Sequence, residues 1–189
     1  MLGFCAGRTA GGARIRTVVI RLGLSAALAM VAGCVSDAIV PAAHPKIDPR
    51  RIALMGFSHG GALTMLASTA WAKETYAPAG TPSFRAFLSF YPNCNTQFPE
   101  RDRVSAPVRI HTGEADDWTP AKPCAALAAA LKASGQNVAI NVYPGAHHAF
   151  DQAQAHIYLP KLGNAAGCFP TLTSILGPVI SGTPSCLKR

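Results

Sequence analysis

One serine in the chain has neighbours of the kind that turn a hydroxyl into a nucleophile. Ser58 is the centre of the G-x-S-x-G pentapeptide at residues 56–60, directly after the apolar run 51–57 and before an Ala- and Leu-rich helical stretch. Such a strand-to-helix turn holds the serine in a strained conformation with its hydroxyl exposed above the sheet. The backbone N–H of His59 would then donate to an oxyanion. The plainer interpretation is a glycine-rich turn with a bystander serine.

A serine hydroxyl is a poor nucleophile near neutral pH, so the pentapeptide predicts a general base and an orienting acid elsewhere in the chain. The order expected with this turn is serine, then acid, then histidine. Asp116 follows the apolar stretch at residues 107–112, and His148 follows the alternating stretch at residues 137–143. Because the carboxyl ends of parallel strands meet at one edge of a sheet, we expect both side chains to converge on Ser58.

In this hypothesis His148 takes the proton of Ser58 and later returns it to the leaving group, while Asp116 fixes the tautomer of the imidazole. The arrangement acts on any acyl carbonyl, so it predicts a serine hydrolase of small-molecule esters, with a thioester or a peptide bond as alternatives. An alternative from another class is a catalytically silent fragment or lipoprotein that acts as a binding module.

The other histidines and the cysteines do not predict a metal site. A set of His147, His148 and Asp151 does not have a recognised ligand spacing, and no C-x-x-C pair occurs, so we expect no metal. Three further histidines have no partner pattern and are predicted to be structural or exposed: His44, His111 and His156.

The elements that must position these residues alternate in type from residue 50 onward. Short β-rich runs alternate with longer helical patterns, which predicts βαβ units and a mostly parallel sheet covered by helices, a three-layer α/β sandwich. The predicted strands are residues 51–57, 84–91, 107–112 and 137–143, and the predicted helices are residues 60–73, 120–134 and 150–162. The Gly-, Pro- and Ser-rich residues 163–189 are predicted to form an irregular, cysteine-containing tail.

Composition predicts one globular unit. The 189 residues are 49% hydrophobic and 14% charged, which argues against disorder. The formal charge of +8 divides into +4 for residues 1–50, with six basic and two acidic side chains, and +4 spread over the rest. Because no basic stripe interleaved with aromatic residues occurs, we expect no nucleic-acid partner.

The N-terminal stretch differs from the rest of the chain. Four arginines precede the apolar run at residues 22–31, and Ala32, Gly33 and Cys34 follow it, which is typical of a secretory signal and resembles a lipobox. Residues 1–34 are therefore predicted to be a signal or lipoprotein segment, with a buried replacement helix as the alternative, and residues 35–162 the catalytic core. We expect a periplasmic or secreted protein, lipid-anchored through Cys34 or not, with a cytoplasmic location as the alternative; the oligomeric state is left open.

Four cysteines lie in the body of the chain and fit disulfides formed in an oxidising compartment. The first candidate pairings are Cys94 with Cys124 and Cys168 with Cys186. The alternative is four independent small buried hydrophobic residues.

Several stretches together resemble the dienelactone hydrolase family, in particular its exported, serine-bearing members. They are residues 42–52, the GFSHGG turn, and the sequences FLSFYPNC, GEADDWTP and YPGAHHAFD, so the resemblance covers about residues 42–162. It implies an α/β-hydrolase fold, no cofactor and ester or lactone hydrolysis through an acyl-enzyme. Spacing alone does not separate Asp116 from Asp117 or His148 from His147, and the family register favours Asp116 and His148.

The chain departs from that family in two respects. The founding members have cysteine where this chain has Ser58, so lactone specificity is not carried over. The strands that normally precede the turn, and the loop that supplies a second oxyanion donor, have no counterpart in residues 1–41, so we expect an N-terminally truncated fold with its front strands missing. The strand before Ser58 would then present an unpaired edge.

Overall fold

The computed structural model describes residues 44–153, 168–172 and 178–182 of the chain. The candidate signal segment with Cys34, the predicted pairing partner Cys186, and His156 lie outside the described residues. In the part of the chain that the structure describes, no helix has both the length and the apolar character needed to cross a membrane.

A four-stranded parallel sheet is the centre of the fold, with the strand order β1-β2-β3-β4. The strands are β1 (Ala53–Phe57), β2 (Ala86–Phe90), β3 (Val108–Gly113) and β4 (Val138–Tyr143). Each lies inside its predicted range or within one residue of it. β1 and β2 are largely apolar runs, which are typical of buried parallel strands, and β3 and β4 mix apolar and polar residues. All four therefore end at the same edge of the sheet, as the convergence of the candidate residues requires.

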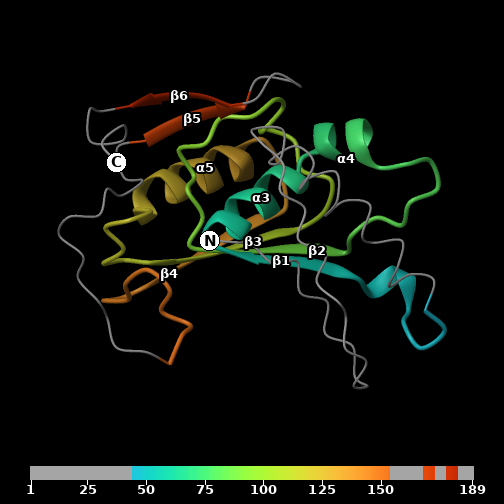
Figure 1. Cartoon of the computed structure of the whole chain (residues 1–189), viewed down its shortest axis with the longest axis horizontal. Helices are drawn as coiled ribbons and strands as arrows, with labels where there is room; N and C mark the ends of the chain where they lie inside the picture. The colour runs from blue at the N-terminus through green and yellow to red at the C-terminus, as the bar shows by residue number, and fades with distance from the viewer. Residues whose placement is uncertain (1–43, 154–167, 173–177, 183–189) are drawn as a thin grey trace, which may run out of the picture.

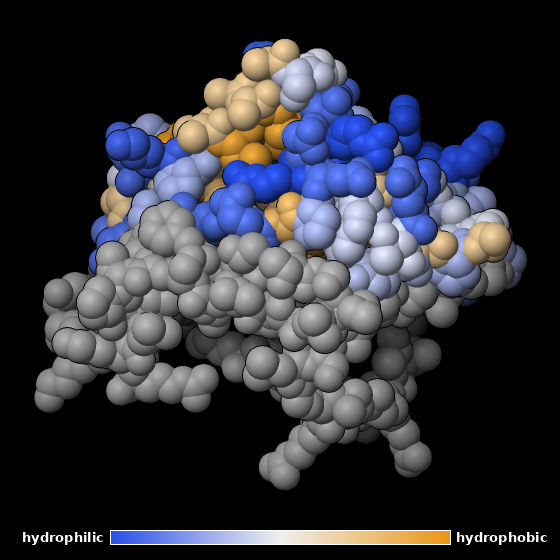
Figure 2. Space-filling view, turned by 90° about the horizontal axis from the view of Figure 1, so that it is seen from above, coloured by the Kyte–Doolittle hydropathy of each residue, from blue (hydrophilic) through white to orange (hydrophobic). Residues whose placement is uncertain are grey.

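Helices cover one face of this sheet (Figure 1). They are α3 (His59–Ala67), α4 (Ala70–Tyr76) and α5 (Ala121–Ala133), with a short 3-10 turn η1 (Pro49–Arg51) before β1. The core lies between α3, α5 and the sheet and includes Leu66, Phe87, Ile110 and Leu131, all at most 3% exposed. Figure 2, which views the molecule from above, shows a hydrophobic area that hydrophilic residues border on its right and lower sides. The fold is α/β-hydrolase-like, and the described helices form one of the two predicted helical layers.

An aromatic row crosses the opposite face of the sheet. Phe57, Phe90 and His111 are paired in register on β1, β2 and β3, and their rings stack at centroid distances of 4.9 and 4.6 Å. His111 also stacks on Tyr143 at 5.9 Å, and its Nδ1 lies 2.8 Å from the Tyr143 hydroxyl. The sequence predicts that His111 is structural or exposed, and these contacts agree with a structural role.

The helix predicted at residues 60–73 is wrong as a single element. It divides between α3 and α4 because Thr69 caps the start of α4, where its hydroxyl accepts from the Ala72 N–H at 3.0 Å. A distant segment holds the break: Ser105 N–H donates to the Ser68 carbonyl at 2.8 Å, and Ala70 N–H donates to the Arg103 carbonyl at 3.0 Å. Local propensity gave no sign of these contacts.

The structure differs from two predictions near the C-terminus. Residues 150–153 form turns and bends, so the helix predicted over residues 150–162 does not begin at residue 150, and the rest of that range lies outside the described residues. Within the predicted irregular tail, β5 (Cys168–Leu172) and β6 (Pro178–Gly182) pair as an antiparallel ribbon. Prolines weigh against a strand in the interior of a sheet, but in a two-stranded ribbon each strand is an edge and tolerates a residue without an N–H.

Candidate active site

The turn between β1 and α3 carries Ser58 in a conformation that few non-glycine residues adopt. Its φ is 53° and its ψ is −115°, and its N–H donates to the Phe90 carbonyl at 2.9 Å. Strain of this kind persists only where the surrounding structure enforces it. Ser58 directly precedes α3, whose first residue is His59, and the first N–H groups of a helix have no intrahelical acceptor. The hydroxyl of Ser58 therefore lies at the positive end of a helix, beside a backbone donor.

Glycines make this turn sterically feasible, although not every one of them is needed. A Cβ at Gly56 would collide with the carbonyl of Gly60, and one at Gly61 would collide with the carbonyl of Phe90. A Cβ at Gly60 would meet no other atom within 4 Å. Gly56 and Gly61 are therefore the two positions where the turn requires glycine, whereas Gly60 has room for a side chain.

The acid loop, residues 113–119, follows β3 and folds around the carboxylate of Asp116. One oxygen, Oδ1, accepts from the N–H groups of Trp118 at 2.9 Å and Thr119 at 2.8 Å. The other, Oδ2, lies 2.9 Å from the Thr119 hydroxyl, which donates to it, and 2.8 Å from Nδ1 of His148. The carboxylate is fully buried, and each of its two oxygens lies within 2.9 Å of two hydrogen-bonding groups.

The base loop, residues 144–151, follows β4 and places His148 between Asp116 and Ser58. Its Nδ1 faces the carboxylate, and its Nε2 lies 2.9 Å from the Ser58 Oγ. When Nδ1 carries the proton and donates to Asp116, the Nε2 lone pair is free to accept the Ser58 hydroxyl proton. The three residues predicted from sequence therefore form one hydrogen-bonded chain at the carboxyl edge of the sheet.

The charge state of Asp116 suits an orienting carboxylate. Burial by itself raises the pKa of this carboxyl, but the hydrogen bonds from His148 and Thr119 outweigh it and hold the pKa below its ordinary value. Asp116 is thus ionised at neutral pH and can accept from the Nδ1–H group of His148.

The acid and base loops are in direct backbone contact. Ala115 N–H donates to the Ala146 carbonyl, and Glu114 N–H donates to the Tyr143 carbonyl, both at 3.0 Å. A Cβ at Gly113 would collide with the Ala146 carbonyl, so only glycine allows this approach. The spacing between Asp116 and His148 is therefore set by main-chain contacts as well as by their own hydrogen bond.

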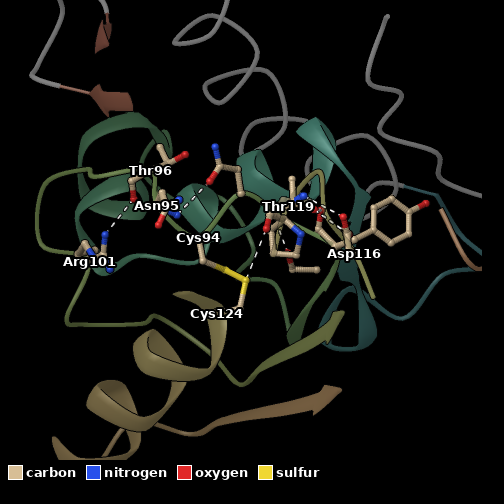
Figure 3. The surroundings of a disulfide bond; sticks show 12 residues. Cys94, Asn95, Thr96, Arg101, Asp116, Thr119 and Cys124 are labelled. Carbon is tan, nitrogen blue, oxygen red and sulfur yellow. Dashed lines mark hydrogen bonds between the residues drawn. A yellow bond between two sulfur atoms is a disulfide. The ribbon is translucent and has the colours of Figure 1, made fainter. Parts of the chain in front are cut away.

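A disulfide joins Cys94 to Cys124 and ties the chain after β2 to the first turn of α5, close behind the acid loop. This is the first of the two predicted pairings, and it is confirmed. In Figure 3, Thr119 and Asp116 lie on one side of the disulfide, and Asn95 and Arg101 lie on the other. A cavity of about 400 Å³ on that second side is lined partly by Cys94, Arg101 and Leu127 and does not include the three candidate residues.

Sequence reasoning missed several neighbours of the site. The Thr119 hydroxyl lies within 3.1 Å of both the Tyr91 carbonyl and His148 Nδ1. The Trp118 ring stacks against the imidazole of His148 at 5.5 Å, and the Tyr91 ring meets it edge-on at 4.7 Å. A threonine three residues after an aspartate is a local turn signal that could have indicated Thr119, whereas Tyr91 carries no comparable signal.

A parallel sheet with a strained serine between β1 and α3, and with acid and base loops after later strands, defines an α/β-hydrolase-like protein. The chain belongs to the dienelactone hydrolase family, because the model of that family matches residues 14–166. The match begins before residue 42, where the resemblance was expected to start. In the part of the chain that the structure describes, the sheet has the order β1-β2-β3-β4 with β1 at its edge, in agreement with the expectation that the strands before the turn are missing.

Individual relatives match the chain more distantly. A curated protein of Bradyrhizobium sp, named "probable 2-oxo-3-(5-oxofuran-2-ylidene)propanoate lactonase", is 26% identical over 133 residues, which cover 65% of this chain and 49% of that protein. The chain thus spans about half the length of that relative. The alignment with esterase 2 of Thermogutta terrifontis covers 64% of this chain and 56% of the esterase chain, at 23% identity and a TM-score of 0.48. The alignment with a candidate dienelactone hydrolase of Klebsiella pneumoniae subsp. pneumoniae covers 67% of this chain and 55% of that protein's chain, at 25% identity and a TM-score of 0.49.

Proposed function

We propose that the chain is a serine hydrolase that cleaves carboxylic esters, lactones included, through an acyl-enzyme on Ser58. The observation that carries the proposal is the hydrogen-bonded chain Ser58 Oγ, His148 Nε2 and Nδ1, Asp116 Oδ2, with distances of 2.9 and 2.8 Å, which begins at a strained serine before a helix. Membership of the dienelactone hydrolase family supports the same class of reaction.

In the acylation step, the Ser58 oxygen attacks the ester carbonyl while its proton passes to Nε2 of His148. The negative charge that develops on the carbonyl oxygen is stabilised by the N–H of His59 at the start of α3. The tetrahedral intermediate then expels the alcohol, which takes the proton from His148 and leaves an acyl group on Ser58. Asp116 keeps the proton of His148 on Nδ1 and stabilises the imidazolium.

Deacylation repeats these roles with water as the nucleophile. His148 removes a proton from the water molecule, whose oxygen attacks the acyl carbonyl, and the intermediate collapses to the carboxylic acid. The same proton then returns from His148 to the Ser58 oxygen. The resting hydrogen-bonded chain is regenerated without any redox step.

The test is reaction of the full chain with a fluorophosphonate probe and with p-nitrophenyl acetate. We expect labelling at Ser58 and ester turnover, with both lost in Ser58→Ala and kcat lower by on the order of 10⁴- to 10⁶-fold. Ser134→Ala, at an exposed serine after α5, is the matched control and keeps both. A folded wild-type chain that neither takes the label nor turns over the ester contradicts the proposal.

We further propose that the protein works in an oxidising compartment. The disulfide between Cys94 and Cys124 supports this, since such bonds persist outside the reducing cytosol, and so does the signal-like composition of residues 1–34. The mass of the mature protein from its native host tests the proposal, and cleavage before Cys34 would indicate a lipidated N-terminus. A mature chain that still begins at Met1 contradicts it.

A further inference from the structure

Tyr91, the residue after β2, has a backbone that connects two parts of the candidate site. Its φ of 36° is in the left-handed region, which is unusual for a residue with a side chain, and it is 1% exposed. Its N–H donates to the His111 carbonyl at 2.6 Å, and its carbonyl accepts from the Thr119 hydroxyl at 3.1 Å. Since the N–H of Thr119 donates to Asp116 Oδ1 at 2.8 Å, the bond from the Thr119 hydroxyl lets the main chain of Tyr91 help to hold the acid loop in place.

The side chain of the same residue reaches the other loop. The Tyr91 hydroxyl donates to Oδ1 of Asp151 at 2.6 Å, and its ring meets His148 edge-on at 4.7 Å and Phe150 at 5.6 Å. Burial, together with the nearby carboxylate of Asp151, raises the pKa of Tyr91 well above its ordinary value. The phenol therefore keeps its proton and remains a donor to Asp151.

His148 lies between two attachments of the base loop. Before it, the Ala146 carbonyl accepts from the acid loop, and after it, Asp151 accepts from Tyr91. Between His148 and Asp151 the chain passes through Ala149 with a φ of 60°, a strained conformation that needs support from its surroundings. The Tyr91 hydroxyl supplies that support through its hydrogen bond to Asp151, two residues after Ala149.

We propose that Tyr91 is a positioning residue that keeps His148 in line between Asp116 and Ser58, through its hydroxyl on Asp151 and its ring against the imidazole. This rests on the proposed function, because it assigns to Tyr91 an effect on the base of that reaction. Tyr91 reaches the reacting atoms only through His148 and the acid loop, so it is not a catalytic residue.

Tyr91→Phe tests the proposal, because it keeps the ring and removes the hydroxyl. A misplaced base slows the proton-transfer steps, so kcat for p-nitrophenyl acetate should fall about ten- to a hundredfold while KM changes little. Asp151→Ala removes the exposed partner of the same hydrogen bond and should lower kcat to a similar extent. Tyr76→Phe, which removes a phenol in α4, is the matched control and should keep the wild-type kcat.

A second measurement separates positioning from a general loss of structure. In a His148→Ala background, Tyr91→Phe should leave the residual rate unchanged, because residues that act through one group have non-additive effects. Three results would overturn the proposal. The first is a fall of the rate by the same factor in both backgrounds, and the second is a raised KM with an unchanged kcat. The third is a wild-type kcat in a folded Tyr91→Phe or Asp151→Ala variant. If Tyr91→Phe does not fold, Asp151→Ala in both backgrounds decides the question.

Failure of the proposed function has a different signature. In that case the folded wild-type chain takes no fluorophosphonate label at Ser58, and both proposals fall together. When the wild-type chain takes the label and turns over the ester, and Tyr91→Phe does so at the same rate, only the positioning role is overturned.

Discussion

The acid loop and the base loop follow adjacent parallel strands, yet they hold their functional side chains in different ways. The carboxylate of Asp116 is fully buried and accepts two hydrogen bonds from N–H groups of its own loop. The imidazole of His148 is 18% exposed, and the described contacts of its ring come from other segments, namely Ser58, Tyr91 and the acid loop.

The acid is therefore held largely by its own loop, whereas the base is held by residues from other parts of the chain. A carboxylate that only orients its partner can be fixed by the turn that contains it, since it accepts hydrogen bonds throughout the reaction. A base must exchange protons with a second group, so its position depends on elements that arrive from elsewhere in the fold. A substitution that shifts the acid loop should therefore also displace His148. The following variants test how strongly the two loops are coupled.

The largest expected effect comes from Asp116→Asn. The amide keeps an acceptor for the N–H groups of Trp118 and Thr119, so the acid loop can keep its shape, but it no longer stabilises the Nδ1–H tautomer of His148. We expect kcat to fall by about 10³- to 10⁴-fold, with a melting temperature that changes far less. Asp117→Asn, at the exposed neighbour, is the control, and an equal loss in both variants would contradict the assignment of Asp116.

Gly113→Ala attacks the contact between the loops. The added Cβ collides with the Ala146 carbonyl, which must move together with the base loop, so the free energy of unfolding should fall by about 1–3 kcal/mol and kcat should fall with it. Gly145→Ala has no atom within 4 Å of the new Cβ and bears only the strain of its φ of +64°, about 1–2 kcal/mol. Urea unfolding and ester kinetics should show that only the first variant combines destabilisation with a large loss of kcat.

A smaller effect is expected from Thr119→Val, which keeps the volume and removes the hydroxyl between Tyr91 and Asp116. The buried carboxylate loses one donor, so the free energy of unfolding should fall by about 1–2 kcal/mol, and kcat should fall less than in Asp116→Asn. Thr119→Ser restores the hydroxyl and should restore kcat. If Thr119→Ser behaves like Thr119→Val, the methyl group rather than the hydrogen bond is responsible.

The smallest effect is the acid dependence of stability. The pKa of Asp116 is lower in the folded chain than its unfolded value of about 3.9, so the folded state binds fewer protons near that pH. The stabilisation from its ionised form is complete above the unfolded pKa and is lost as the pH falls through the lower folded pKa. The difference in unfolding free energy between wild type and Asp116→Asn should therefore shrink between pH 5 and pH 3. Urea titrations that show a constant difference would contradict this.

Much of the sheet and the order of the candidate residues could be predicted from sequence. Two of the parallel strands, β1 and β2, are largely apolar runs with clear breaks and the other two mix apolar and polar residues, and the residues after all four fall at one edge for topological reasons. The break between α3 and α4 could not be predicted, because Ser105 and Arg103 stabilise it from a distance in the sequence. The ribbon of β5 and β6 was hidden by prolines that an edge strand tolerates.

The sequence by itself determined the strained turn at Ser58, the order of nucleophile, acid and base, and a correct disulfide candidate, because each depends on residue types close together or on strand order. Only the tertiary structure decided how the acid and base loops are held. The Thr119 hydroxyl meets a carbonyl 28 residues earlier in the chain, and the Tyr91 hydroxyl meets a carboxylate 60 residues later. Such contacts leave no periodic pattern in the sequence, since they exist only once the strands have brought their ends together.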